Sequence, residues 1–290
     1  MNAMLLAPLV LALACAAVAW FLPSRLSPSV GVPVLTVSTA LAAVVSVLAL
    51  AQIAAAGLSE IPVVADALGW CRALYGGQHG ASPIVGAASG PLLAVALVAI
   101  ARQVRSARRD RRAFEGIEGL VVVDVDGPVA FAVPGRPGGV VIGRDFLRSL
   151  DRSERAVVLA HENAHLRHHH HRYVAVVESC AAGLPFLRPF AVRVRHLTER
   201  WADEDAARRV GSREIVARTI ARLALLPPVS PPSAALGLGG RGIAARVHAL
   251  MGPEPAVTPS IVAVLVATVA TFLVAASVQV HHLVDFVHHP

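Results

Sequence analysis

Two histidines and a glutamate in the run His161-Glu162-Asn163-Ala164-His165 have the residue types and the spacing for metal chemistry. Four residues turn an α-helix by about 400°, so both imidazoles would leave the same helix face one turn apart. Two imidazoles placed in this way can bind one tetrahedral Zn²⁺, with Glu162 close enough to take a proton from water at the metal. The run therefore predicts a zinc centre in which Glu162 is the general base.

A third ligand is predicted further along the chain, where Glu199 and Asp203 are again four residues apart. Glu199 can complete a site of two histidines and one glutamate, which leaves the fourth position open. Asp203 can accept the Nδ1–H of a ligand histidine and so fix the tautomer of that histidine. The alternative is an ordinary charged helix face, because Glu204 and Asp205 follow.

A competing third ligand is His171, which gives the spacing of a different class of zinc peptidase, His-x₃-His-x₅-His. That class needs a glycine where the helix breaks, and this chain has His168 there. It also uses a methionine turn, and the only methionine downstream is Met251. We therefore favour Glu199 as the ligand and interpret His169 to His171 as solvated or membrane-surface residues.

The composition indicates a membrane protein, because hydrophobic residues make up 55% of the 290-residue chain. Four apolar stretches without acidic residues are long enough to span a bilayer: Met4–Phe21, Val34–Ala56, Ile84–Ala101 and Ile261–Val280. The first could instead be a signal peptide, but no basic residue precedes it. We expect four transmembrane helices.

The arginines indicate the orientation of these spans. The basic run 102–112 directly follows the third span, and a basic run beside a span marks the cytoplasmic side. We therefore expect residues 102–260 to lie in the cytoplasm. The net charge is +7, but the arginines are not interleaved with aromatic residues, so direct binding of nucleic acid is not expected.

The segment between the third and fourth spans has the patterning of a folded domain. Three runs rich in β-branched residues predict strands: Leu120–Val125, Val129–Val133 and Val140–Ile142. Asp151 and Glu154 form a capping box that opens a helix through His165. Further helices are predicted over Val192–Val210 and Gly242–Met251, an interfacial or re-entrant hairpin over 173–190, and a loop over Pro227–Pro232.

The predicted fold class is a mainly α membrane protein with four transmembrane helices. A cytoplasmic α+β metallopeptidase domain is inserted between the third and fourth helices. We place the three-helix transmembrane region in residues 1–101, the domain in 102–260, and the fourth helix with a short tail in 261–290.

The segments "PVAFAVPGRPGGVVIGRDFLRSL", "ERAVVLAHENAHLRHH", "ERWADEDAARR" and "RGIAARVHAL" follow one another along the chain. In this order they resemble the BlaR/MecR-like membrane zinc metallopeptidases, a gluzincin family related to HtpX and the CAAX proteases. The resemblance covers most of residues 84–280 and implies a gluzincin-like domain. The antibiotic sensors of this family carry a C-terminal penicillin-binding domain after the last span. This chain ends about ten residues after that span, so β-lactam sensing is not expected.

The resemblance also implies residue roles. By it, His161, His165 and Glu199 are zinc ligands, Glu162 is the general base, and Asp203 is a supporting carboxylate. It further implies that a strand near Ala130 and Phe131 pairs with an extended substrate.

The function expected from the sequence is that of a multi-pass zinc endopeptidase, acting at the cytoplasmic face of the plasma membrane. Its substrate would be a protein or peptide. The expected role is signalling or regulatory proteolysis of a cytoplasmic transcriptional repressor, and the alternative role is membrane-protein quality control of the HtpX type. Two other classes are a transporter and a non-enzymatic, metal-binding signalling scaffold. Transport is disfavoured because transporters place ionisable groups at mid-membrane, and the four spans offer only Ser, Thr and Gln there.

Overall fold

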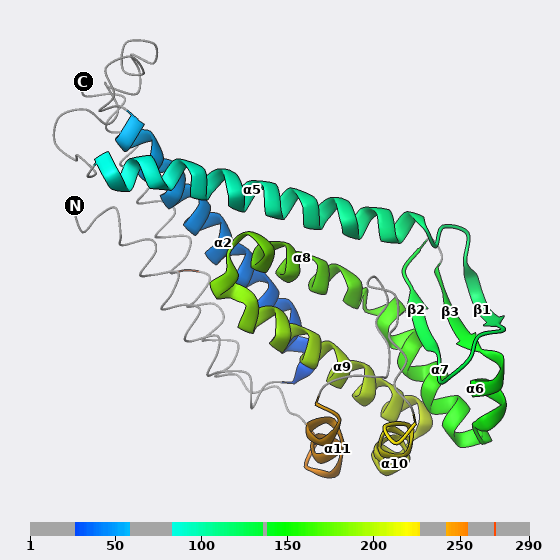
Figure 1. The fold of residues 1–290 in the computed structure, drawn as a ribbon. Helices are drawn as coiled ribbons and strands as arrows, with labels where there is room; N and C mark the ends of the chain where they lie inside the picture. The colour runs from blue at the N-terminus through cyan, green and yellow to red at the C-terminus, as the bar shows by residue number, and fades with distance from the viewer. Residues whose placement is uncertain (1–26, 59–82, 136–137, 227–241, 255–269, 271–290) are drawn as a thin grey trace.

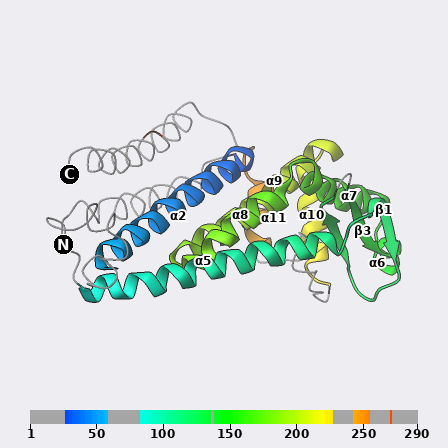
Figure 2. The same cartoon turned by 90° about the horizontal axis from the view of Figure 1, so that it is seen from above.

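The computed structural model describes residues 27–58, 83–135, 138–226, 242–254 and 270. This part of the chain is mostly helical with one small sheet, as the predicted fold class requires (Figure 1). Long helices run side by side at one end of the molecule, and the sheet lies at the other end (Figures 1 and 2). The loop predicted over Pro227–Pro232 lies outside the described residues.

Two of the expected membrane spans fall within long helices, α2 (Pro28–Leu58) and α5 (Pro83–Arg112). Both helices are long and apolar enough to cross a bilayer, which suggests membrane association. The outer face of α5 exposes large apolar side chains, among them Ile84, Leu92 and Val95. The spans expected at 4–21 and 261–280 lie outside the described residues, except for residue 270, so the number of spans and the orientation stay predictions.

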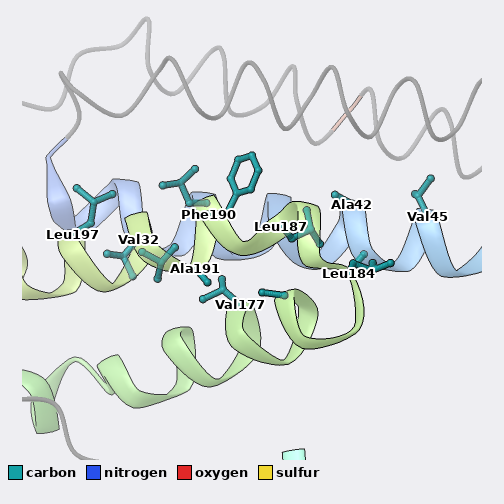
Figure 3. Close-up of a cluster of buried hydrophobic side chains, with 13 residues drawn as sticks. Val32, Ala42, Val45, Val177, Leu184, Leu187, Phe190, Ala191 and Leu197 are labelled. Atoms are coloured by element: carbon teal, nitrogen blue, oxygen red, sulfur yellow. The ribbon is translucent and has the colours of Figure 1, made fainter. Parts of the chain in front are cut away.

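The hairpin predicted over 173–190 is formed by α8 (His170–Gly183), the short 3₁₀ helix η2 (Pro185–Leu187) and α9 (Arg188–Val210). Prolines at the starts of η2 and α9 suit positions where a helix needs no backbone donor. Apolar side chains of the hairpin pack along α2 (Figure 3): Val177, Leu184, Leu187, Phe190, Ala191, Val194 and Leu197. The hairpin therefore joins the rest of the domain to an expected membrane span.

The sheet has three strands in the order β1-β3-β2. β1 (Glu118–Val123) runs parallel to β3 (Gly138–Gly143), whereas β2 (Ala130–Val133) runs antiparallel to it. The strands coincide with the three predicted ones within about two residues at each end. β2 is thus an edge strand among the described residues, and it lies against α7 (Arg152–Arg167).

The register determines which peptide groups of β2 face its unpaired edge. The N–H of Gly143 donates to the carbonyl of Val129 at 2.8 Å. Hydrogen-bonded and non-hydrogen-bonded pairs alternate in an antiparallel ladder, so the next bonded pair is Phe131 with Val141. The peptide groups of Ala130 and Ala132 consequently face the open edge.

Helix α7 begins at the predicted capping box. The carboxylate of Asp151 accepts the N–H of Glu154 at 2.8 Å, and Glu154 accepts the N–H of Asp151 at 2.9 Å. Two adjacent valines of α7 then pack against different neighbours, one against helices and the other mainly against the sheet. Val157 packs against α9, α10 (Arg213–Leu223) and α11 (Ile243–Met251), and Val158 packs against the sheet and α6 (Arg144–Ser149).

Close packing at Gly183 holds the hairpin against α5. A Cβ at Gly183 would lie 2.8 Å from the carbonyl oxygen of Ala96 and 2.6 Å from Cγ1 of Ile100. The first of these atoms belongs to the backbone and can move only if one helix moves. This contact therefore requires glycine, even though glycine lowers helix stability.

We predict that Gly183→Ala destabilises the protein by about 1–3 kcal/mol, because the added methyl group overpacks the contact between α8 and α5. The matched control is Gly90→Ala within α5, where a Cβ meets nothing within 4 Å. The control should be neutral, or stabilise by about 0.5–1 kcal/mol through helix propensity. Denaturant unfolding of the purified protein in detergent micelles measures both, and equal changes would argue against the close contact.

Candidate metal centre

The structure brings His161, His165 and Glu199 together where α7 meets α9. One ligand atom from each of the three lies within 4.8 Å of the others. The Nε2 atoms of the two histidines are 3.1 Å apart. The carboxylate oxygens of Glu199 lie 3.5 Å from Nε2 of His161 and 3.6 Å from Nε2 of His165. Two imidazole nitrogens and a carboxylate thus converge on one point.

The donor set suits a divalent metal of the zinc type, since imidazole and carboxylate are ligands that zinc accepts in open, three-residue sites. His161 and His165 are almost completely buried. Burying polar groups this close together is costly unless something pairs them, and a cation would pair all three at once. The residues present therefore fit a bound metal ion.

Glu162 lies beside this cluster and is fully buried. Neither of its carboxylate oxygens makes a hydrogen bond among the described residues. Burial raises the pKa of Glu162 to about 8, although the neighbouring His161 and the backbone N–H of Ala132 act in the opposite direction. Both oxygens of Glu162 are therefore without a side-chain partner among the described residues, next to the cluster of His161, His165 and Glu199.

Asp203 lies one helical turn beyond Glu199 and contacts His161. Its Oδ1 is 3.0 Å from Nδ1 of His161, and the Nε2 of the same ring faces His165 and Glu199. Burial lowers the pKa of His161, but the contacts with Asp203 and Glu199 outweigh it and raise that pKa to about 9. The sequence analysis expected the carboxylate of Asp203 beside Nδ1 of a ligand histidine, and in the structure it lies beside Nδ1 of His161.

Arg246 from α11 is a site residue that we did not predict from the sequence. Its Nε and Nη2 hold the two oxygens of Asp203 at 2.7 and 2.6 Å, and its Nη1 lies 3.0 Å from Glu199. Burial alone would raise the pKa of both carboxyl groups, but Arg246 and His161 lower the pKa of each to about 2, and His165 also lowers that of Glu199. The sequence offered one indication of this role. Arg246 is four residues before Leu250 in a predicted helix, which places the arginine on the apolar face that is buried.

His170 corrects the interpretation of His169 to His171 as solvated residues. His170 is fully buried, and its Nδ1 lies 2.9 Å from Nδ1 of His165. The reason is a break between helices: α7 ends at Arg167 with His168 as its C-cap, and His169 adopts a left-handed conformation with φ of 52°. His171, the competing third ligand, is not in the cluster that the described residues form.

Comparison with known proteins supports a metallopeptidase. The family model of peptidase family M48 matches residues 99–227, which include the two histidines, Glu162, Glu199 and Asp203. The matched segment ends before α11. No curated protein and no solved structure matches the chain.

We predict that Arg246→Met destabilises the metal-free protein by about 3–5 kcal/mol, because it leaves the buried carboxylates of Asp203 and Glu199 without their cationic partner. The control is Arg218→Met, which breaks an exposed pair with Glu214 and should cost less than about 1 kcal/mol. Unfolding is followed by circular dichroism in a chelator. Similar losses in the two variants would show that the buried contacts contribute little.

Proposed function

We propose that the chain is a membrane-embedded zinc endopeptidase of the M48 type, acting on protein or peptide substrates at the cytoplasmic membrane face. The observation that carries the proposal is the convergence of His161, His165 and Glu199 beside the buried, unpaired Glu162. The family match over residues 99–227 supports metallopeptidase activity. The two candidate spans, α2 and α5, support a membrane location.

In the proposed reaction, His161, His165 and Glu199 hold a zinc ion. When bound, zinc supplies a Lewis acid that polarises the scissile carbonyl and makes water reactive near neutral pH. Glu162 takes a proton from the attacking water and delivers it to the departing amine. Asp203 holds His161 in the orientation that the ligand role requires.

The substrate is proposed to bind as an extended strand along β2. Its backbone would pair with the peptide groups of Ala130 and Ala132, which face the open edge beside α7. Phe131 has a different part in this arrangement, because its own peptide groups pair with β3. Its ring packs edge-to-face on Phe114 at a centroid distance of 6.1 Å. Phe131 therefore stabilises β2, while the peptide groups of Ala130 and Ala132 remain available to the substrate.

The proposed role is regulatory proteolysis of a cytoplasmic repressor, as in the BlaR/MecR-like group. The basic segment that continues α5 beyond Ala101 supports a cytoplasmic site. A non-enzymatic scaffold that binds metal is the alternative class, and it differs from the proposal in having no hydrolytic activity.

We predict that Glu162→Gln lowers hydrolysis of fluorescent casein by about 10²–10⁴-fold while the protein keeps its zinc, because only proton transfer is lost. His165→Ala should lose both zinc and activity. Arg152→Gln, an exposed change at the start of α7, serves as the control. Zinc per chain is measured by mass spectrometry. A Glu162→Gln variant as active as wild type would exclude the mechanism, and an inactive wild type with bound zinc would favour the scaffold.

We predict that Ala132→Pro lowers kcat/KM for a quenched fluorescent peptide by at least roughly 3–10-fold, because it removes one backbone hydrogen bond to substrate and an N–H that also acts on Glu162. Proline is tolerated where an edge strand directs its N–H away from the sheet. Phe131→Pro should instead destabilise the sheet, because it removes the N–H that pairs with Val141. Thermal unfolding separates the two effects. If Ala132→Pro leaves kcat/KM unchanged, the substrate does not use this N–H.

A further inference from the structure

One buried histidine has no part in the proposed hydrolysis. His170 is fully buried at the start of α8, and its Nδ1 lies 2.9 Å from Nδ1 of His165. The other nitrogen of His165, Nε2, faces His161 and Glu199. Each ring nitrogen of His165 therefore has a separate neighbour, with the metal ligands on one side and a second imidazole on the other.

Proton positions follow from the ligand role proposed for His165. A nitrogen that binds a metal offers its lone pair, so Nε2 of His165 carries no proton. The proton of the neutral ring then lies on Nδ1, and Nδ1 donates to His170. Because two donors cannot share one hydrogen bond, Nδ1 of His170 must accept and its proton must lie on Nε2.

The His170 ring is held in place by aromatic contacts. Its centroid lies 4.8 Å from Trp201 of α9 and 5.7 Å from His168, which itself stacks on Trp201 at 4.6 Å. Nε2 of His170 is buried and has no hydrogen-bond partner among the described residues. The ring is thus confined by packing on Trp201 and oriented by its single polar contact with His165.

The chain geometry at the end of α7 makes this contact possible. In a continuous helix, residues five apart point about 140° away from each other. Here α7 ends at Arg167 and α8 begins at His170, and of the two residues between them His169 is in the left-handed conformation. That conformation is costly for residues other than glycine. Because of this break, the His170 ring faces back toward His165 on α7.

We propose that His170 is a positioning residue that fixes the tautomer and orientation of His165 for metal binding, as Asp203 does for His161. The inference rests on the proposed function, which makes His165 a ligand. The two ligand histidines thereby have unlike partners, a carboxylate for His161 and a neutral imidazole for His165. Groups that support ligand histidines in this way typically change metal affinity 10–100-fold when they are mutated.

The test compares His170→Asn with His170→Leu in the full-length protein in detergent micelles. The two side chains have the same number of heavy atoms and the same branching at Cγ, but only Asn keeps an acceptor near the position of Nδ1. Zinc affinity is measured by chelator competition, and folding by circular dichroism. The Leu variant should bind zinc about 10–100-fold more weakly than the Asn variant. The control, His171→Leu, removes the neighbouring imidazole, which is not in the ligand cluster.

A spectroscopic readout makes the test specific for positioning. With Co²⁺ in place of zinc, His170→Asn should retain the visible absorption bands of the wild type, whereas His170→Leu should shift them. Equal zinc affinity of the Asn and Leu variants, or an equal loss in His171→Leu, would overturn the role of His170. Should the Leu variant not fold, a folded Asn variant that binds zinc more than 100-fold more weakly than wild type would also overturn it. A wild-type protein that binds no zinc would instead overturn the proposed function.

Discussion

The fold around the site depends on burying charge where three helices meet. The carboxylates of Glu199 and Asp203, the guanidinium of Arg246 and two imidazoles lie within hydrogen-bonding or ion-pairing distance of one another. Removing charged groups from water costs several kcal/mol for each ion unless partners compensate in good geometry. The bidentate contact of Arg246 with Asp203 supplies such geometry. The helices α7, α9 and α11 therefore have to keep one mutual arrangement, whatever else moves.

This constraint explains why some of the site was predictable from the sequence and some was not. The paired histidines and the paired carboxylates are four apart within single helices, and helical periodicity alone places them on common faces. Arg246 is 43 residues from Asp203, and no periodic pattern relates the two. His170 was misinterpreted because its inward direction depends on a break between helices at His169, and nothing in the composition of the histidine run indicated that break.

The same distinction applies to the fold. The three strands and the helices α7, α9 and α11 were predicted within about four residues of their observed bounds, because β-branched runs, a capping box and apolar periodicity are local signals, whereas α6 and α10 were not predicted. The lengthwise packing of the α8–α9 hairpin on α2 is a tertiary result of many small apolar contacts. It brings the helix that carries Glu199 into the same apolar core as an expected membrane span. Within the described part of the chain, α9 and α2 therefore share one continuous apolar core.

Because Arg246 belongs to α11, the chain cannot be shortened before this helix without removing a buried charge of the site. The segment that matches peptidase family M48 ends at residue 227, and α11 begins at Ile243. A fragment confined to the matched segment would retain His161, His165, Glu199 and Glu162, yet the carboxylates of Glu199 and Asp203 would have lost the guanidinium of Arg246. A fragment that keeps the buried charges of this cluster paired therefore has to extend beyond the matched segment to α11, and electrostatics rather than sequence similarity sets that C-terminal limit.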